Sequence, residues 1–359
     1  MRAAVFKQLG EMPELDDLLE PIAEAGDVII DVVVAPVLAY HDEVFAGKRP
    51  MLFELPFVPG TGAIGRVAAL GAGATELAVG TWVYCDPTLR GRDGQDLPAI
   101  SLQGLTANGP AALPILRQFP NGSWADKLRL PMENVFPLGD ISAQTAPQWL
   151  MLGTMLVPYG GLTAVDLRAG ETVLVNGATG SFGSAAVAVA LGMGAARVIA
   201  TGRNRDALAA LSQRYGSRVR PVEASGGQEV VTAAIAASAG APIDVVLDIL
   251  PPAATPDQVL SAMLAVRPGG RIVLMGGVGM AGGGPLNLPY PWLMRNNITL
   301  RGQWMYPRDA VPRLIEMARS SLVDLSQFEV IEFPLNAVRE AICHAGAAAN
   351  PFIKTVLRP

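Results

Sequence analysis

Three regularly spaced glycines follow a short apolar run in the middle of the chain. Residues 173–175 are Val-Leu-Val, and Gly177, Gly180 and Gly183 come next, ahead of an alanine-rich segment. A strand that turns tightly into a helix presents backbone N–H groups, and the helix dipole favours negative charge at that point. The pattern predicts the pyrophosphate cradle of a dinucleotide site, with a structural turn as the alternative. The predicted contacts in this turn are Gly177, Thr179, Gly180, Ser181, Phe182 and Gly183.

The end of the next predicted strand indicates which dinucleotide is bound. A site for NAD usually has Asp or Glu about 20 residues after the glycines, where the acid holds the ribose 2′-hydroxyl. This sequence has no acid there and instead has Arg203, between Thr201 and Asn204. A guanidinium group offers a planar set of donors that suits a 2′-phosphate. The segment therefore favours NADPH, and the alternative is an ordinary solvated arginine before a helix.

Composition limits the class of protein. The chain has 359 residues, enough for two domains, and its 50% hydrophobic and 16% charged residues are typical of a well-packed α/β protein. The net charge of −5 argues against nucleic acid as a partner, and no apolar run is long enough to span a membrane. Cys85 and Cys343 are too few for a disulfide framework, and no signal-peptide core precedes the first strand. These features indicate a cytoplasmic protein that acts on a small molecule.

The pattern of predicted elements changes near residue 146. Residues 1–145 are rich in β-strands that are separated by Pro and Gly. Residues 146–309 alternate strands with helices, which predicts a doubly wound parallel sheet. Residues 310–359 then return to a helix and a late strand, which we expect to complete the first domain. The Gly/Pro-rich stretch 86–123 is predicted to be a functional loop or lid with little structure.

In this order the motifs resemble those of the medium-chain dehydrogenases/reductases, on the quinone-oxidoreductase side of that superfamily. The motifs that carry the resemblance are residues 56–60 (PFVPG), 65–67 (GRV), 79–83 (VGTWV), 170–175 (GETVLV) with the glycine turn, 267–273 (RPGGRIV) and 354–357 (KTVL). The resemblance covers nearly the whole chain. It implies a GroES-like β-barrel catalytic domain, a Rossmann cofactor domain and an active site in the cleft between them.

The resemblance adds further cofactor contacts and a partner. It implies contacts from Ile249, Gly276 and Gly277, and it places Lys354 where relatives carry a basic residue for the pyrophosphate. For Lys354 the alternative is an exposed strand lysine. The apolar segment 298–306 could be an edge strand that pairs two cofactor domains, as in relatives, which predicts a homodimer.

Residues at the metal positions depart from the zinc enzymes of this superfamily. Those enzymes hold zinc with Cys, with His in a Gly-His-Glu triplet and with a further Cys or acid. In this chain Leu38 and Thr61 stand near the first two positions, and Met151 or Leu152 near the last. These side chains do not supply the ligands that Zn²⁺ requires. The segment 86–123 contains no cysteine for a second, structural zinc. The resemblance therefore implies a zinc-independent member.

A hydrogen-bond donor must then stabilise the negative charge that hydride transfer leaves on a substrate oxygen. Tyr40 aligns approximately with the Ser or Thr that relays protons in the family, and a tyrosine hydroxyl can donate a hydrogen bond or protonate an enolate. His41 could relay charge or act as an acid near neutral pH. The alternatives are a packed aromatic residue for Tyr40 and an exposed or hydrogen-bonded loop histidine for His41.

Three functions fit these observations. The first is a zinc-independent, NADPH-dependent reductase of a quinone, an activated C=C bond or a carbonyl group. The second is a zinc-free alcohol dehydrogenase or carbonyl reductase with the same cofactor residues. The third is a protein that binds NADPH without catalysis, as a sensor or scaffold.

Overall fold

The computed structural model describes residues 1–347 and 350–359, which form two compact units. Unit 1 comprises Met1–Gly153, Leu325–Ala349 and Ile353–Pro359, and unit 2 comprises Thr154–Asp324 and Asn350–Phe352. The sequence predicts boundaries at 145/146 and 309/310, whereas the contacts within the chain place them at 153/154 and 324/325. Helix α10 (Ala310–Arg319) consequently lies in unit 2 and not with the last strand of the chain.

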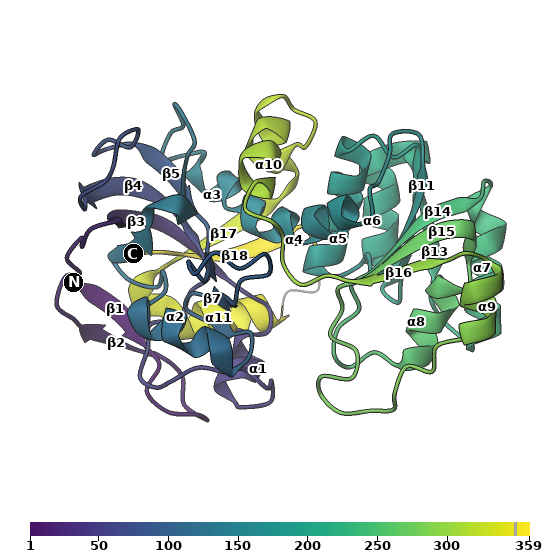
Figure 1. Ribbon diagram of the computed structural model, residues 1–359, viewed down its shortest axis with the longest axis horizontal. Coiled ribbons are helices and arrows are strands. Elements are labelled where there is room, and N and C mark those ends of the chain that lie inside the picture. Colours follow the sequence, from purple (N-terminus) through teal and green to yellow (C-terminus); the bar gives the residue numbers. More distant parts are fainter. Residues whose placement is uncertain (348–349) are drawn as a thin grey trace. The chain divides into compact units, whose positions relative to one another are not determined.

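Unit 1 is built around a seven-stranded sheet (Figure 1). Its strands are β3 (Asp27–Val37), β4 (Ala63–Leu70), β5 (Trp82–Cys85), β9 (Lys127–Pro131), β10 (Val135–Pro137), β17 (Glu329–Pro334) and β18 (Ile353–Arg358). The β-branched run of β3 makes it the longest of these strands, and it pairs antiparallel with β4, β9 and β18. The end of the chain thus completes the N-terminal sheet, as predicted. A separate hairpin joins β1 (Arg2–Val5) to β2 (Glu14–Asp17).

The stretch 86–123 is a small folded lobe, so the prediction of a loop with little structure is wrong. It contains β6 (Thr88–Arg90), β7 (Ile100–Leu102), β8 (Thr106–Ala107), η1 (Pro110–Ala112) and α2 (Leu113–Gln118). The three strands form one antiparallel sheet that packs on α2 around Ala107, Ala112 and Leu116. The buried Ser101 hydroxyl donates to the Ala112 carbonyl over 2.8 Å. Short elements with few apolar residues give little periodicity, which is why the sequence does not reveal them.

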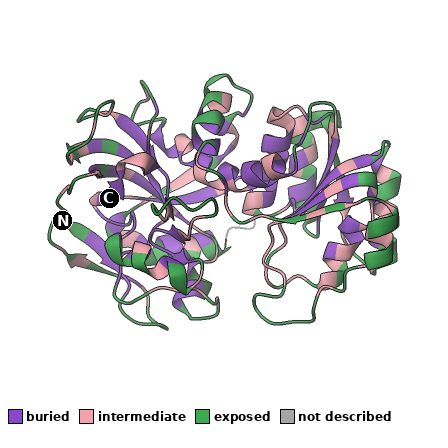
Figure 2. Ribbon diagram, in the orientation of Figure 1, coloured by how far each residue is buried: buried purple, intermediate pink, exposed green. Residues whose placement is uncertain are grey.

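Unit 2 contains the predicted doubly wound parallel sheet. Its strands are β11 (Thr172–Asn176), β12 (Arg197–Gly202), β13 (Val219–Glu223), β14 (Ile243–Asp248), β15 (Val266–Leu274) and β16 (Thr299–Gly302). They stand in the order β13-β12-β11-β14-β15-β16, so the order reverses between β11 and β14. Figure 2 shows the central strands as buried, in keeping with their uninterrupted apolar sequences. Crevices at such a reversal are the usual ligand sites of open α/β sheets.

Helices connect the strands of unit 2. They are α5 (Ser181–Gly192), α6 (Arg205–Tyr215), α7 (Gln228–Ala239), α8 (Pro256–Met263) and α9 (Tyr290–Arg295), with η3 (Gly216–Arg218) before β13. The other helices of the chain are α1 (His41–Phe45), η2 (Met132–Asn134), α3 (Ala146–Trp149), α4 (Met151–Ala164), η4 (Leu325–Gln327), η5 (Leu335–Ala337) and α11 (Val338–Ala347). Within the described residues, none of the helices combines the length and the hydrophobicity needed to cross a membrane.

Candidate functional site

The glycine turn after β11 is closed by backbone contacts that exclude larger residues. A Cβ atom on Gly183 would overlap the carbonyl oxygen of Gly177, so α5 can approach β11 this closely only with glycine at 183. Gly177 itself has a φ of +94°, which favours glycine. Gly180 differs, because the nearest atom to a Cβ there would be 3.6 Å away. The outer surface of the turn is therefore open while its inner surface is packed.

Helix α5 begins at this turn without a side-chain cap. Its first residue is Ser181, and the preceding Gly180 has no side chain that could accept a hydrogen bond from the first helical turn. Backbone N–H groups at a helix start have no partner within the helix, and together with the dipole they suit a phosphate. The Thr179 side chain lies against Gly202, where a Cβ would overlap it. The turn is thus held to the end of β12 and fits the pyrophosphate of a dinucleotide.

A buried chain of hydrogen bonds connects the carboxyl ends of β12, β11 and β14. The Thr201 hydroxyl donates to Asn176 Oδ1 over 2.8 Å, and Asn176 Nδ2 donates to Asp248 Oδ1 over 2.7 Å. Burial raises the pKa of Asp248 to about 7, although the hydrogen bonds from Asn176 and from the Leu250 N–H act in the opposite direction. The Thr201 side chain, predicted to contact the cofactor, is instead directed into this network and positions the turn.

The residues predicted after β14 and β15 gather at the same place. The Ile249 N–H donates to the Asn176 carbonyl over 3.0 Å, and the Gly277 N–H donates to the Leu250 carbonyl over 2.8 Å. A Cβ on Gly276 would lie 2.9 Å from Asp248 Oδ2. Ile249, Gly276 and Gly277 therefore border the strand-order reversal together with Gly177, whose own Cβ would lie 3.2 Å from the Ile249 carbonyl oxygen.

At the end of β12 the polar side chains have different roles. Arg203 is exposed, and no described carboxylate lies within ion-pair distance of it. Asn204 caps α6, because its Oδ1 accepts from the Ala207 N–H over 3.0 Å. Arg205 pairs with Glu223 over 2.7 Å. Arg203 therefore has no ion-pair partner among the described residues, whereas the Asn204 side-chain oxygen is used to cap α6.

In unit 1, Tyr40 directly precedes α1 and is half-buried. The guanidinium carbon of Arg49 lies 4.1 Å from the centre of its ring, and Arg49 is itself paired with Glu43 over 2.7 Å. Burial raises the pKa of Tyr40 to about 12, with Arg49 opposing the shift. The hydroxyl is therefore a hydrogen-bond donor throughout the neutral pH range.

His41 lies in the core of unit 1, where 1% of it is exposed. Its Nδ1 accepts from the Leu38 N–H over 3.1 Å, which assigns the proton of the neutral ring to Nε2. The ring stacks on Phe45 and meets the edge of Trp124 at a centroid distance of 4.8 Å. Burial lowers the pKa of His41 to about 3. A histidine that is neutral near pH 7 cannot act as an acid through its charged form, so that hypothesis is replaced by a role in holding the loop.

The metal positions do not fit zinc. Met151 is 3% exposed and Leu152 is 1% exposed, and both lie in an apolar core, while Leu38 and Thr61 offer no thiolate, imidazole or carboxylate. In the part of the chain that the structure describes, no three His, Cys, Asp or Glu side chains gather in a way that could hold a metal ion.

Lys354 lies on β18 with 7% of its surface exposed, so the alternative of an exposed strand lysine is wrong. Its Nζ lies 5.2 Å from the centre of the Phe328 ring, and burial lowers its pKa to about 7. A contact with the pyrophosphate stays a prediction.

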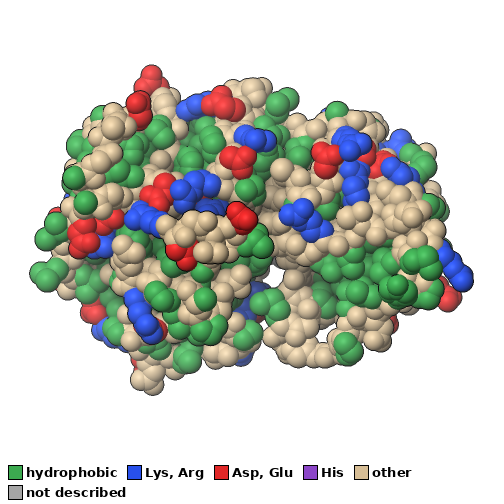
Figure 3. Space-filling model, viewed as in Figure 1, with side chains coloured by type: hydrophobic (Ala, Val, Ile, Leu, Met, Phe, Trp, Pro, Cys, Tyr) green, Lys and Arg blue, Asp and Glu red, His purple; other side chains and the backbone are tan. Residues whose placement is uncertain are grey.

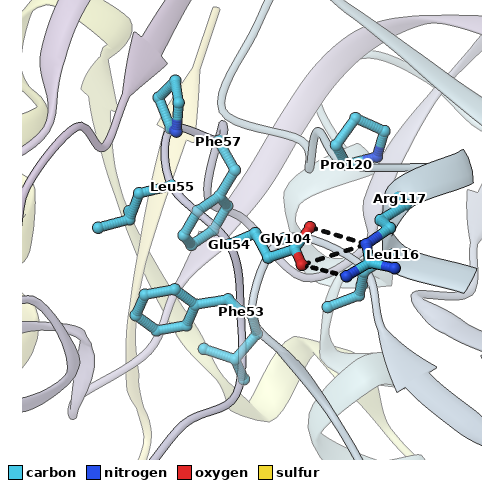
Figure 4. Close-up of a pocket in the computed structure, with 10 residues that line it drawn as sticks. Phe53, Glu54, Leu55, Phe57, Gly104, Leu116, Arg117 and Pro120 are labelled. Carbon is cyan, nitrogen blue, oxygen red and sulfur yellow. Dashed lines mark hydrogen bonds and ion pairs between the residues drawn. The ribbon is translucent and has the colours of Figure 1, made fainter. Parts of the chain in front are cut away.

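A pocket that the sequence alone does not reveal lies in unit 1 between residues 53–57 and α2 (Figure 4). Its lining comprises Phe53, Glu54, Leu55, Pro56, Phe57, Gly104, Leu105, Leu116, Arg117 and Pro120. The Phe53 and Phe57 rings pack with centroids 5.1 Å apart, and Arg117 Nη2 donates to Glu54 Oε1 over 2.6 Å. An apolar wall beside an ion pair suits a small apolar or aromatic group. The motif at residues 56–60 (PFVPG) was the feature of the sequence that could have indicated part of this wall.

Two family models match the chain, one in each unit. Residues 24–140 match the model described as "Alcohol dehydrogenase GroES-like domain", and residues 182–320 match the model described as "Zinc-binding dehydrogenase". The chain belongs to the medium-chain dehydrogenase/reductase superfamily. The predicted fold class, a GroES-like domain with a Rossmann-type parallel sheet, is confirmed.

Characterised relatives are distant. An alcohol dehydrogenase of Moraxella sp. is 26% identical over 61% of this chain and 62% of its own length. Sorbitol dehydrogenase of Bacillus subtilis is 23% identical over 100% of this chain and 97% of its own. Acryloyl-coenzyme A reductase of Metallosphaera sedula is 29% identical over 61% of this chain and 63% of its own. The first and third matches thus span less than two thirds of those enzymes.

Solved structures share the fold over the whole chain. An alcohol dehydrogenase from E. coli, complexed with NADH, has a TM-score of 0.80 at 18% identity and covers 100% of this chain and 99% of its own. A Sinorhizobium meliloti protein bound to NADP has a TM-score of 0.81 at 19% identity, with the same coverage.

The burial of His41 predicts acid sensitivity. Its pKa is about 3 in the folded protein and about 6.5 in the unfolded chain, so below pH 6.5 protons bind preferentially to the unfolded chain. This group should lower the free energy of unfolding by about 1 kcal/mol between pH 7 and pH 5.5, with further loss down to about pH 3. Urea unfolding at several pH values should show this slope, and His41→Gln should remove it. A slope unchanged in His41→Gln would contradict the assignment, and His344→Gln controls for the loss of a histidine as such.

Proposed function

We propose that the protein is a zinc-independent, NADPH-dependent oxidoreductase that reduces a quinone, an activated C=C bond or a carbonyl group of a small molecule. The observation that carries this proposal is the open glycine turn at the strand-order reversal, followed by an uncapped helix. The exposed Arg203 at the end of β12 supports NADPH over NADH. The relatives named as dehydrogenases and reductases support an enzyme.

Each group of this site has a physical task. The backbone of the turn around Gly180 and Ser181 holds the pyrophosphate, and Arg203 binds the 2′-phosphate. A dihydronicotinamide bound there would supply hydride to the substrate. The Tyr40 hydroxyl donates a hydrogen bond to the substrate oxygen and so stabilises the charge that develops there. A single neutral donor suits substrates that spread this charge, such as quinones and enones.

A zinc-free alcohol dehydrogenase or carbonyl reductase is the second candidate. The names of the alcohol and sorbitol dehydrogenases favour it, whereas the acryloyl-coenzyme A reductase favours reduction of a C=C bond. A turnover screen with NADPH against quinones, enones, aldehydes and ketones separates the two. Faster reduction of quinones or enones than of simple ketones would support our proposal. Tight NADPH binding without turnover of any substrate would instead support a sensor or scaffold.

We further propose that two copies pair through β16, the last strand of the unit 2 sheet. Figure 3 shows hydrophobic side chains over the region of β16 and α9, where Tyr290, Met294 and Trp304 are exposed. Light scattering should then give the mass of a dimer. The double variant Met294→Glu, Trp304→Glu should shift the protein toward monomer, because charge on an apolar interface is costly to bury. Leu19→Glu, at an exposed position of unit 1, is the control, and a monomeric unmodified protein would refute the dimer.

Removing the Arg203 guanidinium should weaken NADPH binding selectively. A charge-assisted hydrogen bond contributes roughly 1.5–3 kcal/mol, so Arg203→Ala should lower NADPH affinity by about tenfold to a hundredfold and leave NADH nearly unchanged. Fluorescence titration of both cofactors measures this. Arg168→Ala, at another exposed arginine of unit 2, should bind both as the unmodified protein does. Equal binding of the two cofactors by the unmodified protein would exclude this specificity.

The role of Tyr40 can be isolated with Tyr40→Phe, which removes only the hydroxyl. The variant should lower kcat by about tenfold or more with little change in NADPH affinity. Tyr215→Phe, at a half-buried tyrosine of unit 2 outside the proposed sites, is the matched control. An unchanged kcat, with hydride transfer shown to be rate-limiting by a deuterium isotope effect, would remove Tyr40 from the mechanism.

Metal independence predicts full activity after chelation. Leu38, Thr61 and Met151 supply no zinc ligand, so protein dialysed against a chelator should keep its kcat and its free energy of unfolding. Elemental analysis before dialysis completes the test. Stoichiometric zinc that is lost together with activity would overturn the prediction.

A further inference from the structure

A carboxylate reaches the end of β12 from the neighbouring strand. Glu223 is the last residue of β13, and its register partner is Gly202, the residue before Arg203. Arg205 Nε donates to Glu223 Oε2 over 2.7 Å. The hydrogen bonds from Arg205 and Ser225 and the positive charge of Arg205 lower the pKa of Glu223, while its slight burial opposes them. Glu223 is therefore ionised near pH 7 and is held by Arg205.

This arrangement opposes the effect of Arg203. In sites for NAD a carboxylate at this edge accepts from the ribose 2′-hydroxyl, and a carboxylate repels a 2′-phosphate. The pairing also commits Arg205 Nε to Glu223, which partly offsets the charge of this second cation. The acid that the sequence lacks at the end of β12 is thus supplied at the end of β13, where its register partner Gly202 directly precedes Arg203.

We propose that Glu223 is a second specificity-determining residue, which limits the preference of this site for a 2′-phosphorylated ribose by placing negative charge beside Arg203 and by holding Arg205. The inference rests on the proposed dinucleotide function. It assigns opposite effects to the two partners of one ion pair. Loss of the Glu223 charge removes repulsion and releases a cation, whereas loss of the Arg205 guanidinium leaves the carboxylate uncompensated.

The test measures binding of adenosine fragments to the full-length protein, without turnover. Calorimetry with adenosine 2′,5′-bisphosphate and with 5′-AMP gives the ratio of the two affinities for each variant. Glu223→Gln should raise the ratio in favour of the bisphosphate by about threefold to tenfold, with AMP binding no more tightly. Arg205→Ala should lower the ratio by a similar factor. Asp166→Asn removes a carboxylate from another exposed ion pair of unit 2 and should leave the ratio unchanged.

The two opposite shifts separate electrostatics from structure. If the Arg205–Glu223 pair only stabilised α6, both variants would weaken both ligands, and the inference would be wrong. An unchanged ratio in Glu223→Gln would also overturn it. An unmodified protein that prefers AMP, yet shifts in both directions as stated, would refute the NADPH proposal and support the role of Glu223. Binding of neither fragment by the unmodified protein would contradict both.

Discussion

The close approach of helix α5 to strand β11 is the constraint on which the candidate cofactor site depends. Because Gly183 has no side chain, the helix start can lie against the Gly177 carbonyl, beside the open space at Gly180. The same turn is fastened on its other side, where the Thr179 side chain occupies the space that a side chain on Gly202 would need. The turn is therefore packed on both sides before any ligand binds, which suits phosphate binding because less has to be ordered when the ligand binds.

Next to this turn, side-chain hydrogen bonds connect the carboxyl ends of three neighbouring strands. The Thr201–Asn176–Asp248 chain crosses β12, β11 and β14 at the strand-order reversal. A buried polar group that loses its partner is costly in free energy, so this network favours one register of the three strands. These strands carry the glycine turn, Arg203 and Ile249. In this arrangement the buried polar side chains position the strands and the turn. The exposed backbone of the turn and Arg203 are the groups proposed to bind the ligand.

Local pattern was enough to predict much of unit 2, and tertiary context explains the rest. The run at β11 and the glycine turn are continuous in sequence, so their structure could be predicted from spacing alone. Strand β13 could not be predicted in this way, because Val-Arg-Pro-Val-Glu does not alternate regularly between apolar and polar residues. Only two of its residues are buried. The pairing of Glu223 with Arg205 depends on that unpredicted strand. The burial of His41 likewise depends on Trp124, which lies far away in the sequence and approaches only in the folded unit.

The loop of Tyr40 is held by packing at the place where zinc enzymes of this superfamily use a metal. Trp124 is fully buried, its Nε1 donates to the Pro36 carbonyl over 3.0 Å, and it packs against both Gly60 and the His41 ring. One indole thus joins β3, the turn that contains Thr61 and the start of α1. His41 adds the hydrogen bond to the Leu38 N–H. Because aromatic packing and one neutral histidine make these connections, the segments with Leu38 and Thr61 are joined without any metal ligand.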